Sequence, residues 1–232
     1  MQKLLFFIIL LNAGLFSPLF CQNKYEKERA KMVRQQILAR GITDKNTLMA
    51  MKTVPRHLFV PDKYVDYAYK DIPLPINYGQ TISQPYIVAC MTNLLHVGSG
   101  DTVLEIGTGS GYQAAVLSRI AAQVYTIEII KELGLSAKAR LKTMNYNNVE
   151  VKIADGYDGW KEHGPYDGII VTAASEYIPP PLINQLKNNC SMIIPIGSPF
   201  SIQNLMLVTR KGKKIITKSL MLVRFVPLTR KK

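Results

Sequence analysis

One segment limits the possible folds of this chain more than any other. Residues 103–106 form a short, mostly apolar run, and residues 107–111 form a turn that holds three glycines. A helical pattern comes directly after it, and a second apolar run ends at the acid Glu128. Because glycine has no Cβ, the backbone of such a turn can approach a bound ligand closely. A strand, a glycine turn, a helix and a second strand ending in an acid predict a nucleoside-binding site in a parallel α/β sheet.

The spacing of the glycines indicates which nucleoside cofactor to expect. Gly107, Gly109 and Gly111 follow a GxGxG pattern, whereas dinucleotide-binding enzymes use GxGxxG. Without the third glycine that shapes a pyrophosphate cradle, the turn suits a cofactor with adenosine and no phosphates, and we expect S-adenosylmethionine. Glu128 is placed to accept hydrogen bonds from two ribose hydroxyls, and Thr108 lies within the turn. The alternative is a glycine-rich turn in a sheet that binds no cofactor.

Further polar residues of the predicted cofactor site come after the other strands. Glu105 could order the turn and reach the methionine amino group through water; alternatively, its charge is a partner for a helix N-terminus. Asp155 and Gly156 come after the third strand, where the acid can reach the adenine amino group and the glycine admits the ring. The alternative there is a plain Asp-Gly turn. Thr172 comes after the fourth strand and completes the predicted set.

The chain alternates strands and helices in the way that βαβ units require. We therefore expect an α/β fold with a doubly wound, Rossmann-like sheet that is mostly parallel, with an antiparallel C-terminal hairpin after it. The expected strands are 102–106, 124–128, 149–153, 167–172 and 191–196, the helices are about 111–121, 131–144 and 179–187, and the hairpin is 203–209 with 214–225.

A helical extension precedes this core. Residues 25–40 are predicted to form a helix with Val33, Ile37 and Arg40 in register, and residues 44–53 a second helix. The irregular stretch after them, 56–80, is long enough to suggest that it binds a ligand or closes over one. Ser83 is expected to be the N-cap of the next helix, with Pro85 in its first turn.

The first residues have the pattern of a secretory signal peptide. Lys3 precedes an apolar stretch that ends at Phe20, and polar residues come next. We expect residues 1–21 to be removed after Cys21, leaving one exported domain, periplasmic or secreted, with no stable membrane insertion. An uncleaved anchor and lipid attachment at Cys21 are the alternatives. Residues 22–232 are expected to be one domain, with the N-terminal helices and the irregular loop in residues 22–85 and a cofactor-binding core in residues 86–232.

The placement of the basic residues and of the histidines argues against nucleic-acid binding and metal binding. The formal net charge is +13, and much of the excess lies after residue 187. We interpret it as a solubilising hairpin tip and tail, because basic and aromatic residues are not interleaved as in single-strand binders, and no nucleic-acid partner is expected. The three histidines lack ligand spacing, so no metal is expected. Cys90 and Cys190 are expected to be two separate buried thiols.

The segment after the fourth strand gives information on the reaction. Enzymes that methylate base or amide nitrogen often carry Asn/Asp-Pro-Pro-Tyr there, but residues 171–174 are Val-Thr-Ala-Ala. No cysteine is poised as a nucleophile and no histidine stands where a base is needed. An acceptor that is already an anion at neutral pH, such as a carboxylate, needs no general base. It needs only to be held in line with the methylsulfonium.

Five segments resemble one known family, the protein-L-isoaspartate O-methyltransferases, and the likeness runs from about residue 32 to residue 228. The resemblance implies a class I S-adenosylmethionine-dependent methyltransferase fold and a repair enzyme. Such an enzyme methylates the α-carboxylate of L-isoaspartyl residues in proteins and peptides; the ester loses methanol to give a succinimide, which hydrolyses partly to aspartate. By position, Ser83 takes the active-site serine role, with Thr81 beside it. The segments are 54–61 (VPRHLFVP), 72–85 (IPLPINYGQTISQP), 104–113 (LEIGTGSGYQ), 169–174 (IIVTAA) and 223–228 (VRFVPL).

The chain departs from the family pattern at a few positions. Asn77 and Asn189 stand where glycine is usual, and both are expected to adopt left-handed backbone angles. Ala154 replaces another glycine before Asp155. Most relatives resemble cytosolic proteins, so a cytoplasmic location is the family-based alternative to export, and we expect a monomer. Two other functions remain open: methylation of a different acceptor, such as nucleic acid, and an exported binding protein without turnover.

Overall fold

The computed structural model describes residues 18–198 and 201–230, and it is built around one seven-stranded sheet. Most of the predicted signal peptide, residues 1–17, lies outside the described residues. The sheet order is β5-β4-β3-β6-β7-β8-β9. The first five strands of this order are parallel, and β8 and β9 are antiparallel to their neighbours. The strands are β3 (Thr102–Ile106), β4 (Gln123–Glu128), β5 (Val149–Ile153), β6 (Tyr166–Val171), β7 (Leu186–Ile196), β8 (Gln203–Lys211) and β9 (Lys214–Val223).

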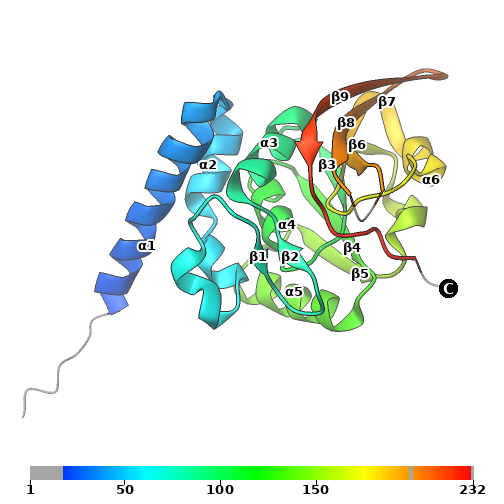
Figure 1. Cartoon of the computed structure of the whole chain (residues 1–232). Helices are drawn as coiled ribbons and strands as arrows, with labels where there is room; N and C mark the ends of the chain where they lie inside the picture. Colours follow the sequence, from blue (N-terminus) through cyan, green and yellow to red (C-terminus); the bar gives the residue numbers. More distant parts are fainter. Residues whose placement is uncertain (1–17, 199–200, 231–232) are drawn as a thin grey trace, which may run out of the picture.

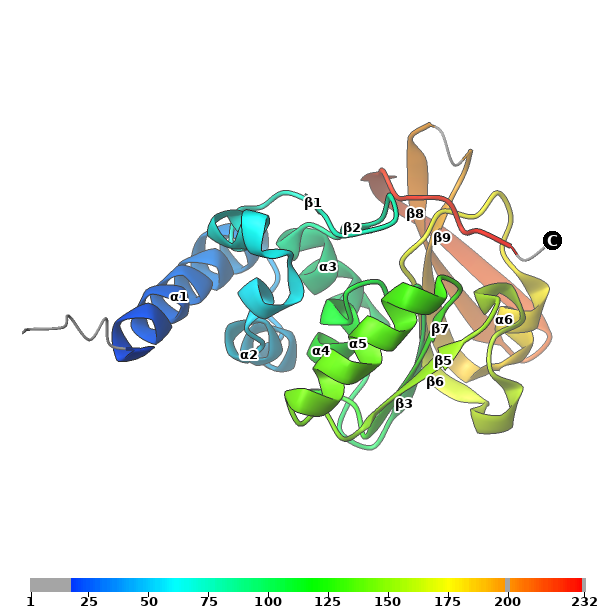
Figure 2. The same ribbon diagram turned by 90° about the horizontal axis from the view of Figure 1, so that it is seen from below.

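Helices cover both faces of this sheet. Because successive strand residues point to opposite faces, the buried strands divide the core in two. Val103 and Val124 pack with α3, α4 and α5, whereas Leu104 and Ile127 pack on the side of α6 (Figure 2). The predicted doubly wound α/β fold is confirmed. The helices are α3 (Pro85–Leu95), α4 (Tyr112–Leu117), α5 (Lys131–Thr143) and α6 (Pro180–Asn184).

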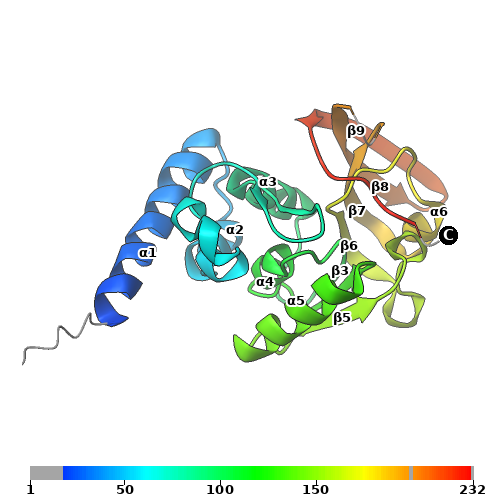
Figure 3. The same cartoon turned by 60° about the horizontal axis from the view of Figure 1, so that its bottom comes forward.

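The helical extension lies beyond α3, to one side of the sheet (Figures 1 and 3). Helix α1 (Pro18–Met32) continues as a π turn, Val33–Ile37, and a 3₁₀ turn, Leu38–Arg40, before Gly41 ends it at φ +88°. Helix α2 (Lys45–Thr53) is capped by Asp44, whose carboxylate accepts a 2.7 Å hydrogen bond from Thr47 N. Both predicted helices are therefore present.

The irregular stretch after α2 contains more order than the sequence suggested. It holds two 3₁₀ helices, Arg56–Phe59 and Asp62–Tyr67, and a two-stranded ladder of β1 (Leu74–Pro75) with β2 (Thr81–Ile82). This ladder carries Thr81 toward the sheet and leads directly into α3.

Several local predictions were wrong. Arg40 is exposed and not in register with the buried Val33 and Ile37. The helix predicted at 179–187 is limited to α6, because the chain joins β7 from Leu186 onward. Asn189 has the expected left-handed φ, +63°, but Asn77 does not, since the left-handed turn falls on Tyr78 and Gly79 instead.

The cysteine prediction was right in part. Both thiols are free, as expected; Cys90 is buried but Cys190 only partly so.

The topology fixes where a ligand can bind. Strands β3 and β6 are neighbours, while the chain leaves β3 toward β4 and leaves β6 toward β7. Connections therefore diverge at the carboxyl ends of β3 and β6, which is the crevice where doubly wound sheets bind ligands. Gly107 comes directly after β3 and Thr172 directly after β6 at this point.

Candidate active site

The glycine turn is held close against the end of β6. Gly107 has φ +96°, and its N–H and that of Thr108 both donate to Ile127 O. A Cβ added at Gly107 would lie only 2.5 Å from Thr172 Oγ1. That hydroxyl lies 3.0 Å from Ile106 O and 2.7 Å from Gly107 O, so its one proton is shared between the two carbonyls. Thr172 therefore shapes the turn, and the turn admits only glycine at position 107.

Glu128 ties the turn to the end of β4. Its carboxylate accepts hydrogen bonds from Gly109 N at 2.8 Å and from Ile130 N at 3.0 Å, and the side chain is buried. A carboxylate offers about four acceptor positions, so these amides leave capacity for two further donors. Glu128 also lines the cavity under the turn. Its arrangement fits a ligand that presents a pair of hydroxyls.

A buried chain of hydroxyls lies beneath the turn. Thr126 Oγ1 lies 2.6 Å from Glu105 Oε2 and 2.7 Å from Thr108 Oγ1. Because Thr126 has one hydroxyl proton and donates it to Glu105, Thr108 is the donor to Thr126. Glu105 Oε1 has no hydrogen-bond partner in the part of the chain that the structure describes. Burial raises the pKa of Glu105 to about 8, so the carboxyl holds its proton at neutral pH.

The predicted adenine residues meet the C-terminal tail. Asp155 Oδ1 accepts a hydrogen bond from Tyr157 N, and its Oδ2 accepts from Arg230 Nε at 2.7 Å. The Arg230 guanidinium also lies 3.7 Å from the centre of the Tyr157 ring. A Cβ at Gly156 would come within 2.4 Å of the Ile106 side chain, so the backbone packs tightly there. An adenine amino group would therefore have to compete with Arg230 for the carboxylate of Asp155.

Two cavities meet at this edge of the sheet. One, the cofactor cavity, is lined by Gly107, Gly109, Glu128 and Gly156 and is covered by tail residues 226–229. It measures about 60 Å³, less than the about 300 Å³ of a typical ligand site, because the tail lies across it. The tail is held by reciprocal hydrogen bonds of Ala174 with Val226 O and Leu228 N, each 2.8 Å.

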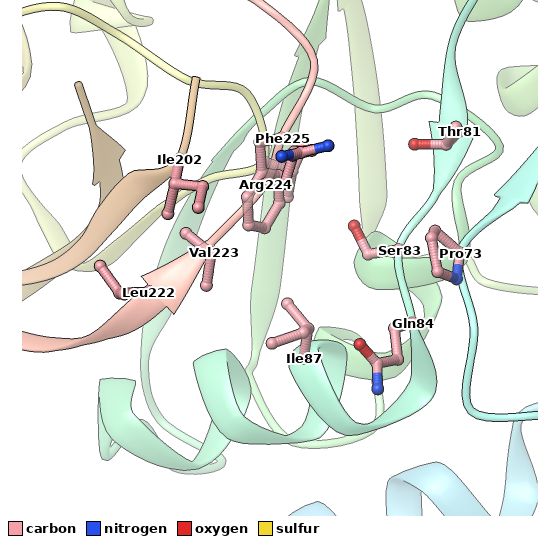
Figure 4. Close-up of a pocket in the computed structure, with 11 residues that line it drawn as sticks. Pro73, Thr81, Ser83, Gln84, Ile87, Ile202, Leu222, Val223, Arg224 and Phe225 are labelled. Carbon is pink, nitrogen blue, oxygen red and sulfur yellow. The ribbon is translucent and has the colours of Figure 1, made fainter. Parts of the chain in front are cut away.

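The second cavity, the acceptor cavity, encloses about 410 Å³. Thr81 and Ser83 point their hydroxyls into it, opposite Arg224 and Phe225, which come directly after β9 (Figure 4). Thr81 and Thr172 line both cavities, so the two share a wall. A group bound in one therefore lies next to a group bound in the other.

Ser83 is not the N-cap of α3, contrary to the sequence prediction. Gln84 occupies that position, without a capping hydrogen bond from its own side chain, and Pro85 takes the first helical position as expected. Asp71 supplies the cap from thirteen residues upstream. Its Oδ1 accepts from Tyr86 N at 3.1 Å, while Oδ2 accepts from Gln84 Nε2 and Arg40 Nη1, both at 2.7 Å. The Ser83 hydroxyl is thereby left for the cavity.

The structure sorts the predicted site residues into two groups. Those that line the cavities are Thr81, Ser83, Gly107, Gly109, Glu128, Gly156 and Thr172. The others, Glu105, Thr108, Gly111 and Asp155, lie beneath or beside the turn; a Cβ at Gly111, for example, would touch Leu141 of α5. Sequence reasoning missed Asp71 and Arg224. Arg224 falls in segment 223–228, which resembles the family, and this resemblance could have indicated that Arg224 belongs to the site.

The family model described as "Protein-L-isoaspartate(D-aspartate) O-methyltransferase (PCMT)" matches residues 27–232. The chain belongs to this family. The protein-L-isoaspartate O-methyltransferase 2 of Shewanella sediminis is 53% identical over 206 residues, which cover 89% of this chain and 84% of that protein. The enzyme of the same name from a Polaromonas species is 55% identical over 187 residues, 80% of this chain and 89% of its own length.

Solved structures of the isoaspartate methyltransferase family share the fold. A protein-L-isoaspartate O-methyltransferase superposes with a TM-score of 0.79 at 28% identity; the match covers 87% of this chain and 65% of that one. A Plasmodium falciparum family member, solved in complex with S-adenosyl-L-homocysteine, superposes with a TM-score of 0.75 at 25% identity. That match covers 88% of this chain and 99% of the other. The family is S-adenosylmethionine-dependent. This agrees with the two acceptor positions that Glu128 keeps for a pair of hydroxyls and with the glycine turn at Gly107, which lets the backbone approach a ligand closely. Among the described residues no group of three or more metal-ligating side chains occurs.

In this family member the Asp71 cap should carry substantial stability. We expect Asp71→Ala to lower the free energy of unfolding by about 2 kcal/mol, because Tyr86 N and Arg40 both lose their acceptor. Asp71→Asn keeps an acceptor for Tyr86 N but replaces Oδ2 with an NH2 group, so it loses the half-exposed ion pair with Arg40 and the hydrogen bond from Gln84 Nε2. Its cost should be about 1 kcal/mol, half that of Asp71→Ala. Urea unfolding of both variants measures the difference. Equal effects of the two substitutions would contradict the capping role.

Glu105 should make stability depend on pH. Its pKa rises from 4.5 in the unfolded chain to about 8 in the folded protein, so the folded state binds the extra proton between these values. The resulting stability is complete below pH 4.5 and is lost as pH rises through 8. Glu105→Gln keeps an acceptor for Thr126 and cannot ionise. We expect the free energy of unfolding of this variant, measured with urea, to rise relative to wild type by at least about 2 kcal/mol between pH 5 and pH 9. If the free energies of unfolding of the two proteins changed in parallel with pH, the assignment would be refuted.

Proposed function

We propose that this chain transfers a methyl group from S-adenosylmethionine to the α-carboxylate of L-isoaspartyl residues in damaged proteins and peptides. The ester would then close to a succinimide with loss of methanol, and hydrolysis of the succinimide would give partly aspartate. One observation carries the proposal: a hydroxyl-lined acceptor cavity and a glycine-lined cofactor cavity share Thr81 and Thr172 as their common wall. Such adjacency is required for direct transfer between two bound groups.

The acceptor cavity has the groups that a carboxylate needs. A carboxylate is ionised at neutral pH, so no residue has to remove a proton from it. The Ser83 and Thr81 hydroxyls can donate to one carboxylate oxygen, which leaves the other oxygen as the nucleophile. Arg224 adds positive charge at the rim, and the apolar side chains of Ile87 and Phe225 limit the access of water.

The cofactor cavity supplies a different set of contacts. When bound, S-adenosylmethionine provides an electrophilic methyl group on its sulfonium. We assign the ribose hydroxyls to Glu128 and close backbone approach to Gly107 and Gly109. Asp155 and Gly156 remain our assignment for adenine. Glu105, Thr108, Gly111 and Thr172 are assigned to holding the turn in shape.

A paired-peptide assay tests the activity. The protein is incubated with S-adenosylmethionine labelled in the methyl group and with two peptides that differ only in an aspartyl or isoaspartyl linkage. We expect base-labile label on the isoaspartyl peptide alone. Label on neither peptide would favour a binding protein without turnover. Label on a nucleic acid, with none on the peptides, would favour a methyltransferase with that acceptor.

We also propose that the protein is exported after removal of residues 1–21. The apolar segment before Cys21 supports this, and the family match begins only at residue 27. The chain just after the proposed cut packs on the rest of the domain, since Lys24 pairs with Asp66 and the Tyr25 ring stacks on His57 with ring centroids 4.0 Å apart. Within the described residues no helix is long and apolar enough to cross a membrane.

The terminus of the natural protein tests the export proposal. Edman or mass-spectrometric analysis should find Gln22 as the N-terminal residue of the natural protein. We expect this form in the extracytoplasmic fraction, and we expect it to be a monomer. An intact residue 1 in the cytoplasm would overturn it in favour of a cytoplasmic enzyme. A membrane-bound form starting at residue 1, or one starting at a lipid-modified Cys21, would overturn it in favour of an anchor.

A further inference from the structure

The hairpin formed by β8 and β9 has an unusual charge distribution. Residues 203–224 contain six lysines and arginines and no acid. On β9 the residues from Lys214 to Ser219 are all exposed, and the apolar Ile216 among them is 48% exposed. The cations of this segment therefore face solvent, and none has a carboxylate of its own hairpin to pair with. This arrangement produces a positive potential along the strand.

β9 is also an unpaired sheet edge. It is the last strand in the sheet order, so among residues 18–198 and 201–230 only β8 forms backbone hydrogen bonds with it, along one side (Figure 1). An exposed edge is a template onto which another extended chain can add. Lysines on such an edge also discourage pairing between copies of the same chain, because their charges repel. The edge therefore favours a partner strand that carries negative charge.

The edge leads into the acceptor cavity. Leu222, Val223 and Arg224, at the end of β9, form one wall of that cavity opposite Ser83 (Figure 4). A chain lying along β9 would therefore reach the cavity without a turn. Strand geometry places Lys218 about 17 Å and Lys214 about 30 Å from Val223, at about 3.4 Å per residue.

We propose that the edge of β9 docks an extended, acidic segment of the substrate polypeptide that flanks the isoaspartyl residue. The proposal rests on the proposed function and adds to it a substrate class: unfolded segments with acidic residues about four to ten positions from the damaged site. Backbone hydrogen bonds to β9 hold the segment, and Lys214 and Lys218 select its charge. The surplus positive charge of the hairpin thus has a role beyond solubility.

The charge is tested with two isoaspartyl peptides that differ only in four flanking residues, glutamate in one and glutamine in the other. Each is made with the flank on the amino side and on the carboxyl side. We expect kcat/KM to be about fivefold higher for the glutamate peptide in one of the two orientations, and this preference to vanish at high salt. The double variant Lys214→Gln/Lys218→Gln should remove the preference at low salt.

A matched double variant controls for the loss of two charges. Lys138 and Lys142 are exposed on α5, away from the hairpin, and Lys138→Gln/Lys142→Gln should keep the full preference. Equal kcat/KM for both peptides in both orientations would overturn the proposal, as would equal loss in the two double variants. Hairpin-dependent binding of a DNA oligonucleotide without any peptide preference would overturn it in favour of a nucleic-acid surface. Failure to methylate even the glutamine peptide would instead refute the proposed function.

Backbone pairing has a separate signature. Single N-methylation at successive flank positions should reduce kcat/KM at every second position, because only alternate N–H groups of an edge partner face β9. A scan without this period of two would exclude strand addition.

Discussion

Ser83→Ala is expected to lower kcat/KM for an isoaspartyl peptide by about 100-fold, the typical effect of removing one preorganised donor to a reacting oxygen. The free energy of unfolding should stay within about 0.5 kcal/mol of wild type. The reason for this separation is structural: the Ser83 hydroxyl faces the acceptor cavity, while Asp71 caps α3. Initial rates and urea unfolding on the same preparation measure the two effects.

Two comparisons sharpen the Ser83 test. Affinity for S-adenosyl-L-homocysteine should be unchanged, because Ser83 lines only the acceptor cavity. Ser83→Thr restores a hydroxyl and should recover part of the activity. Full activity of Ser83→Ala would show that the serine does not hold the acceptor. A loss of stability of about 1 kcal/mol would indicate that Ser83 is a cap after all.

Gly107→Ala is expected to weaken binding of S-adenosyl-L-homocysteine by more than about 100-fold and to lower the free energy of unfolding by about 3 kcal/mol. The left-handed φ of +96° already disfavours a side chain. In addition, the new Cβ would lie 2.5 Å from Thr172 Oγ1, so the turn and the end of β6 would have to separate. Calorimetric titration and urea unfolding measure the two losses.

Gly212→Ala is the matched control for Gly107→Ala. Gly212 also has a positive φ, +59°, but a Cβ there would meet nothing within 4 Å. It should therefore show only the backbone cost of about 1 kcal/mol and keep full cofactor affinity. If both variants lost the same stability and Gly107→Ala still bound the ligand normally, close packing of the turn on Thr172 would not be needed for the site.

The parts of the site that could be predicted from the sequence are those encoded locally. Strands β3 and β5 were predicted with their observed bounds, because β3 is a short, mostly apolar run, β5 alternates apolar and charged residues, and turn residues end both. The Gly107–Thr172 contact is a consequence of the same pattern, since parallel strands bring their carboxyl ends to one edge of the sheet. Glu128 at the end of β4 was found in this way as well.

The features that could not be predicted depend on residues far apart in the sequence. Local rules favour a serine as the cap, so they assign Ser83 and cannot detect the carboxylate of Asp71, thirteen residues before Gln84. The ion pair of Arg230 with Asp155 spans 75 positions, and no periodicity signals it. Arg224 was hidden for a related reason: its place in the cavity depends on how the hairpin packs against the loop that carries Ser83.

The central claim is that the methyl group goes to one carboxylate of one kind of residue. The direct measurement is tandem mass spectrometry of an isoaspartyl peptide that also contains glutamate and a free C-terminus, quenched in acid after incubation with S-adenosylmethionine. We expect a single methyl group, located on the α-carboxylate of the isoaspartyl residue, and appearance of the aspartyl peptide on return to neutral pH. A methyl group on the glutamate, the C-terminus or a nitrogen would contradict the account.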